Sequence, residues 1–192
     1  MKVGKTGVNA NTPKSIVFGA GTIHKGLKYV GNKWNYEESV IGATQGGSKI
    51  TIVPEFKDIE ADGALVLAKG LKVKVGEKAN MELNMLEIKK DMIKSAIIGK
   101  DGTSADNKLD LIETKANIEV GDYYENIAFV GKTLENKDII VIMDNALCTN
   151  GFELEGKNKE NGALKMTFEC HAGLDSDLST LPIHIYYPKV EM

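Results

Sequence analysis

Two stretches of the chain decide the fold. Residues 46–64 read GGSKITIVPEFKDIEADGA, and residues 69–86 read KGLKVKVGEKANMELNML. On the second stretch Met81, Leu83 and Met85 fall on one face and polar residues fall on the other, because side chains in a strand alternate sides. The pattern predicts two long strands joined by a turn-rich segment, with one face towards a core and the other towards water.

The composition argues against nucleic-acid binding as the main activity. The chain has 192 residues, of which 42% are hydrophobic and 27% charged, which is ordinary for a soluble globular fold. Its formal net charge is −3, and all 24 cationic residues are lysines. Tight binding of DNA needs clustered cations that release counterions from many phosphates. Arginine is the usual source of bidentate contacts to phosphate and to guanine. We therefore do not expect a typical DNA-binding protein.

The N-terminal residues and the cysteines predict a protein of the cytosol. The chain starts without the apolar run of a signal peptide, and no stretch is long enough to cross a bilayer. Residues 1–14 are polar and unpatterned, so we expect a flexible N-terminal arm. Cys148 and Cys170 are too few for a disulfide framework and lack metal-site spacing, which predicts buried free thiols.

The remaining segments predict short strands and one helix. Residues 87–98 carry one apolar stripe and end at Gly99, where a left-handed cap is expected. A polar loop is expected at 99–107, and residues 139–143 alone are apolar throughout, as a centrally buried strand should be. The other expected strands are 15–20, 22–29, 34–41, 109–120, 123–130, 152–155, 164–170 and 183–187.

These elements together predict the fold class. We expect a mainly β protein with one helix, an antiparallel β-sandwich or barrel. No linker, repeat or low-complexity tract interrupts the chain, so a single domain over residues 1–192 is expected, with a long hairpin loop at 58–71.

Residues 19–38 contain part of a dinucleotide-binding motif. Gly19 and Gly21 follow a short apolar run, and Glu38 lies where a ribose-binding carboxylate could sit. The motif needs a third glycine and then a helix, but His24 takes that place and Gly26 interrupts the helix. A glycine turn between two strands is the better interpretation.

Histidine, cysteine and carboxylate side chains offer two further candidate catalytic arrangements. Cys170 and His171 are neighbours on an expected strand and point to opposite faces, although a pair of Cys170 with His24 or His184 stays open. Asp58, Glu60 and Asp62 alternate on one side of a strand end without aromatic platforms for a sugar. We expect a solvated charged loop there or a contact between subunits, and no enzyme, cofactor or metal.

Several segments resemble the major tail tube proteins of long-tailed bacteriophages of Gram-positive hosts. They are IVFGAG at 16–21, GATQGG at 42–47, VPEFKDIEADGA at 53–64, KGLKV at 69–73 and MELNMLEI at 81–88. Similar tubes occur in contractile tails and in phage-tail-like bacteriocins. The resemblance covers about the first half of the chain.

The resemblance implies a self-assembling structural protein of a virion tail, assembled in the host cytoplasm. Subunits would form hexameric rings that stack into a tube, and sheets joined across subunits would enclose a channel for DNA as a transient, non-specific passenger. The implied partners are copies of the chain and other tail proteins such as the tape measure, tail tip and terminator. A channel wall biased towards carboxylates and neutral amides would let a duplex slide.

Two sets of residues are predicted to serve that assembly. The candidates for the channel wall are Asn80, Glu82 and Asn84, and, as a second set, Lys165, Thr167 and Glu169. The candidates for subunit or ring contacts are Asp58, Glu60, Asp62, Leu65, Val66, Leu67 and Lys69, because the apolar run 64–68 falls in an expected loop. The alternative function is a tail-associated or carbohydrate-binding β-sandwich module that does not polymerise.

Overall fold

The computed structural model describes residues 6–154, 158–159 and 161–189. Its helices are α1 (Thr12–Ser15), α2 (Tyr36–Ser39) and α3 (Lys90–Ala96), with a 3-10 turn η1 (Val120–Asp122). Its strands are β1 (Val17–Lys25), β2 (Tyr29–Val30), β3 (Lys33–Trp34), β4 (Thr44–Asp58), β5 (Lys72–Met85), β6 (Gly99–Gly102), β7 (Leu111–Thr114), β8 (Tyr124–Thr133), β9 (Asp138–Cys148), β10 (Leu164–Cys170) and β11 (Ile183–Tyr186). The predicted mainly β, antiparallel class is confirmed.

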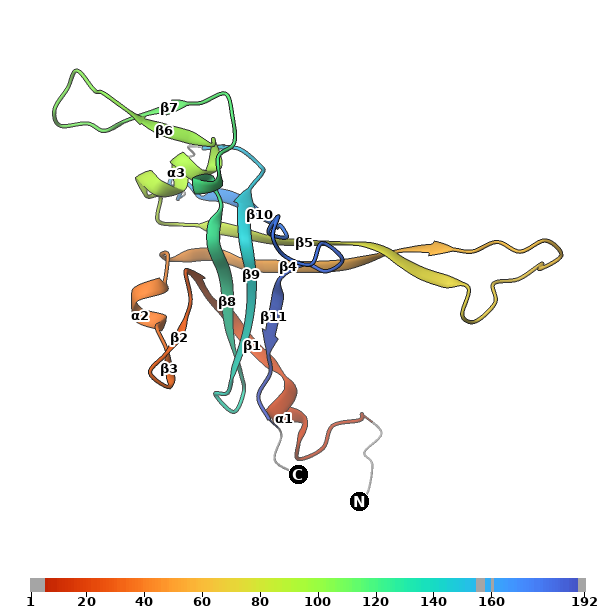
Figure 1. Cartoon of the computed structure of the whole chain (residues 1–192). Helices are drawn as coiled ribbons and strands as arrows, with labels where there is room; N and C mark the ends of the chain where they lie inside the picture. The colour runs from red at the N-terminus through yellow and green to blue at the C-terminus, as the bar shows by residue number, and fades with distance from the viewer. Residues whose placement is uncertain (1–5, 155–157, 160, 190–192) are drawn as a thin grey trace.

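One curled sheet holds most of the strands (Figure 1). Its order is β1-β8-β9-β10-β5-β4, and β11 pairs with β9 beside β10. Residues 140–143 of β9 pair with β11, residues 146–148 pair with β10, and Asn145 between them has a positive φ of 49°. The sheet divides at this irregularity, so that β4 and β5 cross the other strands (Figure 1).

The two ends of the sheet approach each other. The Ile41 N–H donates to the Ile23 carbonyl at 3.0 Å, and an isolated bridge joins His24 to Val40, just before β4 begins. The first and last strands of the path are therefore linked at one end, as in a partly closed barrel.

The main core lies inside the curl. β5 contributes Met81, Leu83 and Met85, β10 contributes Met166 and Phe168, and all five are at most 1% exposed. Met92 and Ala96 of α3 are also buried in this cluster. A second cluster on the other side of β8 and β9 is covered by Trp34 and Tyr36. Residues 139–143 of β9 are all buried, which confirms the prediction of a central strand.

The single predicted helix is shorter than expected. α3 ends at Ala96, and Ile98, with φ 51°, takes the left-handed position predicted for Gly99. Gly99 instead begins β6, which pairs with β7 inside the segment expected to be a polar loop. A Cβ at Gly99 would lie 3.0 Å from the Glu113 carbonyl oxygen, so a larger residue there would crowd the pairing of β6 with β7.

Other expected elements also differ from the structure. Residues 36–39 form α2 rather than a strand, β7 covers only 111–114 of the strand expected at 109–120, and residues 152–154 form no strand. Glu155, the last residue of that expected strand, lies outside the described residues. In the N-terminal arm, α1 begins at Thr12, and residues 1–5 lie outside the described part. The arm's flexibility and the single-domain organisation stay predictions.

Candidate functional site

The six candidates for the channel wall lie together on one sheet surface. Asn80, Glu82 and Asn84 project from β5 on the side opposite the buried Met81, Leu83 and Met85. β10 pairs with β5 so that Lys165 lies opposite Asn84, Thr167 opposite Glu82, and Glu169 opposite Asn80. The sequence predicted two separate sets, and the strand register makes them one.

β4 extends this surface by a third strand. Lys49 and Thr51 lie opposite Glu82 and Asn80, and Val53 lies opposite Lys78. We call the outward-facing side of these three strands the polar face. Its members are Lys49, Thr51, Val53 and Glu55 of β4, Lys78, Asn80, Glu82 and Asn84 of β5, and Lys165, Thr167 and Glu169 of β10.

The polar face, taken over all three strands, is balanced in charge. It carries three lysines and three glutamates. Lys49 pairs with Glu82 at 3.1 Å, and Lys78 pairs with Glu55 at 2.7 Å. The hydrogen bond and charge of Glu55, with a smaller effect of Glu169, raise the pKa of Lys78. Each of these two lysines is thus held against a carboxylate on the neighbouring strand.

Asn150 hydrogen-bonds the backbone of β10 at one border of the polar face. The sequence did not indicate this role. Its Oδ1 accepts from the Thr167 N–H at 2.7 Å, and its Nδ2 donates to the Lys165 carbonyl at 2.9 Å. The side-chain amide thus occupies the positions that a neighbouring strand's backbone would take along this part of β10.

The opposite border of the polar face is open. β4 ends the strand order, and within the described residues its only strand partner is β5. A strand at the end of a sheet presents a row of unpaired N–H and C=O groups on its outer side. β4 offers this edge while one of its faces is polar and the other carries the partly buried Ile50 and Ile52 against the core.

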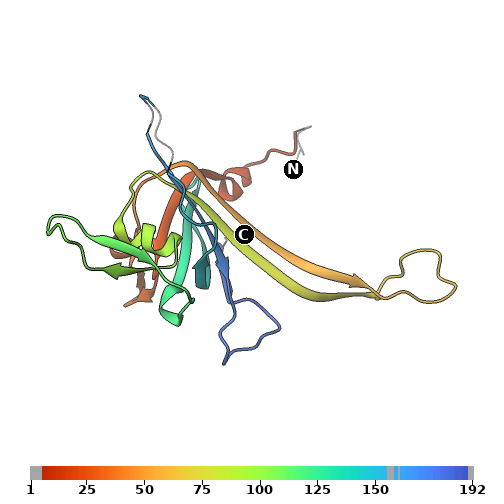
Figure 2. The same ribbon diagram turned by 90° about the horizontal axis from the view of Figure 1, so that it is seen from above.

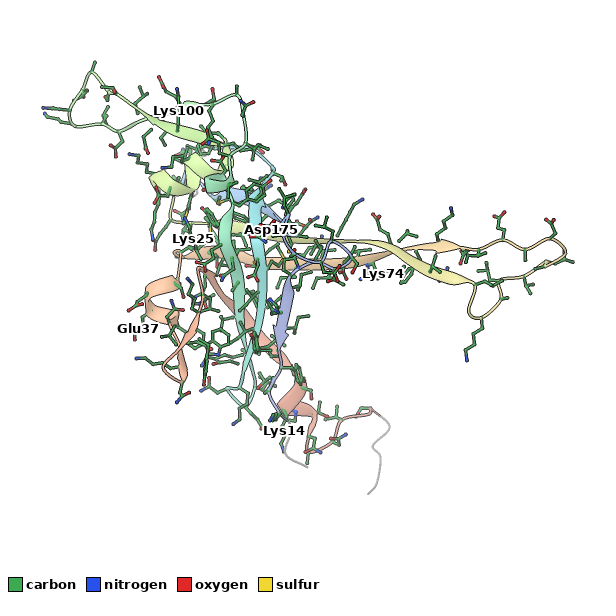
Figure 3. All side chains as sticks on the ribbon, viewed as in Figure 1. Lys14, Lys25, Glu37, Lys74, Lys100 and Asp175 are labelled. Carbon is green, nitrogen blue, oxygen red and sulfur yellow. The ribbon has the colours of Figure 1, made fainter. Side chains whose placement is uncertain are left out.

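The far half of the β4–β5 hairpin projects from the body of the molecule (Figures 1 and 2). We call residues 55–75 the arm. Its loop spans residues 59–71, and the run 64–68 is fully outside any core: Leu65 is 97% exposed, Val66 81% and Leu67 76%. Phe56, Val73 and Val75 on the arm's strands are also exposed. Side chains project along both sides of the arm, and the labelled Lys74 lies on it (Figure 3), where its Nζ pairs with Glu77 at 3.1 Å.

The charged contact candidates on the arm behave differently from one another. Asp58 pairs with Lys72 across the hairpin at 2.6 Å, so it supports the arm's own register. Glu60, Asp62 and Lys69 are exposed and make no ion pair with any described residue. These three remain available to a partner.

The histidines and cysteines do not form the catalytic pair that the sequence left open. His24 is bonded to Ser39 and Thr22, and His184 Nε2 lies 3.2 Å from Asp144 Oδ2. Both cysteines are free and buried, as predicted. Burial raises the pKa of Cys170 to about 12, so its thiol stays protonated and is a poor nucleophile.

The described residues offer neither a metal-binding cluster nor a membrane-spanning helix. They contain no group of three histidine, cysteine or carboxylate side chains placed to hold a metal ion. No helix in this part of the chain has the length and apolar character to span a membrane.

No family model matches the chain, and no curated protein matches it either. Among solved structures, the chain is similar to one described as "Virion of native gene transfer agent (GTA) particle", with a TM-score of 0.45 and 10% sequence identity. The match covers 80% of this chain and 92% of that chain. A likeness of this degree is no evidence of function, so the function is inferred from the residues of this chain.

Proposed function

We propose that the chain is a virion structural protein that assembles with copies of itself into stacked hexameric rings, forming a tail tube through which DNA passes. The observation that carries the proposal is β4, which has a core on one side, a polar face on the other and an outer edge with no strand partner among the described residues. The resemblance of residues 16–21 and 42–88 to tail tube proteins supports the same function.

The open edge of β4 supports assembly because a second copy can complete its hydrogen bonds. Joining sheets edge to edge gives the backbone groups partners and removes a site for random aggregation. Pro54 limits the length over which two copies can pair, because it has no N–H and interrupts any ladder of backbone hydrogen bonds on the outer side of β4. Residues 48–53, which precede Pro54 and follow the irregular pairing between Thr44 and Ser48, are the segment that we propose to pair with the neighbour.

The polar face supports the role of channel wall. A duplex binds where free lysines replace the counterions of its phosphates. Here Lys49 and Lys78 each have a carboxylate partner on the adjacent strand, and the glutamates and lysines are equal in number. A charge-balanced wall attracts a passing phosphate backbone weakly, so a duplex can slide.

The arm supports a contact beyond the ring's own sheet. Exposed contiguous apolar surface usually marks an interface. The run 64–68 lies at the end of the hairpin that projects away from the core. In the proposed tube it packs on a neighbouring subunit or on the next ring. The tape measure, tail tip and terminator proteins are further partners that a tail tube requires.

Concentration-dependent assembly tests the proposed function. Purified protein at high concentration should form hollow tubes of uniform width under negative-stain microscopy. Hydrogen exchange should show the amides of residues 48–53 becoming protected in the tubes relative to the dilute protein. Protein that stays monomeric at high concentration, or tubes in which residues 48–53 exchange as fast as in the monomer, would contradict the proposal.

A further inference from the structure

The β2–β3 hairpin exposes a group of aromatic side chains outside the polar face. The Tyr29 and Trp34 rings meet edge to face at 5.2 Å between centroids, and Trp34 meets Tyr186 of β11 at 5.0 Å. Tyr29, Val30 and Tyr186 are 58%, 63% and 49% exposed. We call Tyr29, Val30, Trp34 and Tyr186 the aromatic patch. Large exposed aromatic side chains grouped in this way are typical of protein interfaces.

A cavity of about 680 Å³ lies against the aromatic patch and is lined by both signs of charge. Lys28 and Lys33 line it from the β2–β3 hairpin, and Glu37 and Glu38 line it from α2. Lys28 is also paired with Glu125 at 2.7 Å. An apolar occupant of the patch would therefore sit between lysines on one element and carboxylates on another.

The arm carries a matching arrangement. Its apolar run 64–68 is preceded by Glu60 and Asp62 and followed by Lys69. Carboxylates on one side and a lysine on the other complement the two lysines and two glutamates that border the aromatic patch. Such complementarity fixes register and orientation more than it adds affinity.

The arm and the aromatic patch lie on opposite sides of the molecule. In Figures 1 and 2 the arm extends to the right, while β2, β3 and α2 lie on the left, and Figure 3 shows Lys74 and Glu37 on these two sides. The arm therefore cannot reach its own patch. Two complementary surfaces on opposite sides make a heterologous, head-to-tail contact, which propagates from copy to copy.

We propose that the aromatic patch of one copy receives the arm tip of another. Leu65 and Leu67 pack on Tyr29, Val30 and Trp34, with Glu60 and Asp62 towards Lys28 and Lys33, and with Lys69 towards Glu37 and Glu38. This inference rests on the proposed function, because it names the surface to which the arm binds during self-assembly.

Trp34 gives a direct readout, because it is the sole tryptophan of the chain. Its emission should shift to shorter wavelength when the dilute protein is concentrated into tubes, since docking removes water from the indole. The shift should be absent in Leu65→Glu, in which the arm tip cannot enter an apolar site. Leu65 is 97% exposed, so this variant leaves the folded monomer intact, which far-ultraviolet circular dichroism checks.

Matched variants locate the contact. Leu65→Glu and Val30→Glu should each raise the protein concentration for half-assembly about tenfold, the effect of losing one well-buried aliphatic contact. Leu174→Glu is the control, because Leu174 is 93% exposed and belongs to neither surface. It should assemble at the wild-type concentration.

Crosslinking identifies the two surfaces as partners. Leu65→Cys protein mixed with Val30→Cys protein should give a heterodimer with a short bis-maleimide, whereas Leu65→Cys with Leu174→Cys should not. The native Cys148 and Cys170 are 2% and 7% exposed and do not compete. A crosslink between two Leu65→Cys chains only would assign the arm to another arm and overturn the inference.

The remaining outcomes separate the inference from the proposed function. Tubes that form without the Trp34 shift and without the heterodimer overturn the inference and leave the tube function standing. Protein that never assembles refutes both. An emission shift of the dilute protein on adding a soluble glucan oligosaccharide, retained in Leu65→Glu, would assign the patch to carbohydrate and overturn the inference.

Discussion

At the scale of single residues, His24 is a buried histidine whose two ring nitrogens are hydrogen-bonded to hydroxyl groups. The Ser39 hydroxyl donates to the Asn35 carbonyl at 2.7 Å, so the His24 Nδ1–H donates to Ser39 Oγ at 2.9 Å. His24 Nε2 is then left to accept from the Thr22 hydroxyl at 2.8 Å. The ring is 2% exposed, and burial lowers its pKa. His24 thus holds β1 against the segment before β4 and is not a catalytic base.

The lowered pKa of His24 predicts that the protein loses stability in mild acid. The unfolded ring takes up a proton near pH 6.5 and the folded ring only at a lower pH, so the free energy of unfolding falls as the pH drops through this range. One such group contributes a slope of at most about 1.4 kcal/mol per pH unit. Urea unfolding between pH 7.5 and pH 5.5 measures the slope.

Substitution assigns this slope to His24. His24→Gln can still donate to Ser39 and accept from Thr22, but it does not titrate, so the variant should lose most of the slope. His171→Gln, a histidine elsewhere in the fold, should keep it. An unchanged slope in His24→Gln would contradict this account of the buried ring.

At the scale of the element, β1 contains a bulge built by the two glycines that resembled a nucleotide-binding turn. Phe18 pairs with Lys132 and Thr22 with Val130, so three residues of β1 lie opposite one residue of β8. Gly19 and Gly21 have φ values of 93° and 68°. The motif is therefore a bulge inside one strand, not a turn between two strands, and it bends β1 where the sheet curls.

The bulge predicts different effects for its two glycines. A Cβ at Gly21 would meet the Phe129 ring and lie 2.8 Å from the Val130 carbonyl oxygen, whereas at Gly19 it would meet nothing within 4 Å. Gly21→Ala should lower the free energy of unfolding by about 2–4 kcal/mol, from the left-handed backbone and the clash together. Gly19→Ala should lower it by about 1–2 kcal/mol, from the backbone alone. Equal losses in urea unfolding would show that the clash is relieved by movement of β8.

Strand alternation made some elements predictable and left others hidden. β10 covers the predicted residues 164–170, and β5 has the predicted buried and polar faces, because one side of each strand meets the core. β6 was missed because its residues Gly99–Gly102 are polar and small and pair outside the core. The sequence does not predict α2 as a helix because four residues are too few to reveal a helical period.

The candidate site was predictable in its residues but not in its assembly. Alternation alone placed Asn80, Glu82 and Asn84 on one face, but their neighbours depend on strand order and register, which no local pattern encodes. The pairing of β10 with β5, the charge balance and the part played by Asn150 appear only once the strands are placed. An asparagine in a polar loop carries no signal that it will complete a strand edge.

At the scale of the whole molecule, the β4–β5 hairpin carries two thirds of the strands of the polar face near the body and the arm at its far end. Near the body, β4 and β5 have a core on one side and the polar face on the other. Beyond Pro54 the core ends, and the same strands carry exposed Phe56, Val73 and Val75. The hairpin can therefore present a charge-balanced wall near the body while its far end reaches another copy.

The charge balance of the polar face predicts what happens when it is made basic. Glu82→Lys with Glu169→Lys leaves both side chains in exposed or half-exposed positions, so the fold and the tubes should form as in the wild type. The face then carries five lysines and one glutamate in each subunit, and a duplex inside the channel should be held by counterion release. Tubes of this variant should retain a short linear duplex at low salt and release it steeply as salt rises, whereas wild-type tubes should not retain it.

The topology of the DNA shows where the basic face lies. A closed circular duplex has no end to thread, so it cannot enter a channel, but it can bind to an outer surface. If the polar face lines the channel, the double variant should retain linear duplexes and fail to retain circular ones of the same composition. The control is Asp106→Lys with Glu135→Lys, which adds the same charge at two exposed positions between β6 and β7 and between β8 and β9, outside the polar face, the arm and the aromatic patch. Equal retention of linear and circular DNA by the Glu82→Lys, Glu169→Lys tubes would place the polar face on the outside and contradict the proposed channel wall.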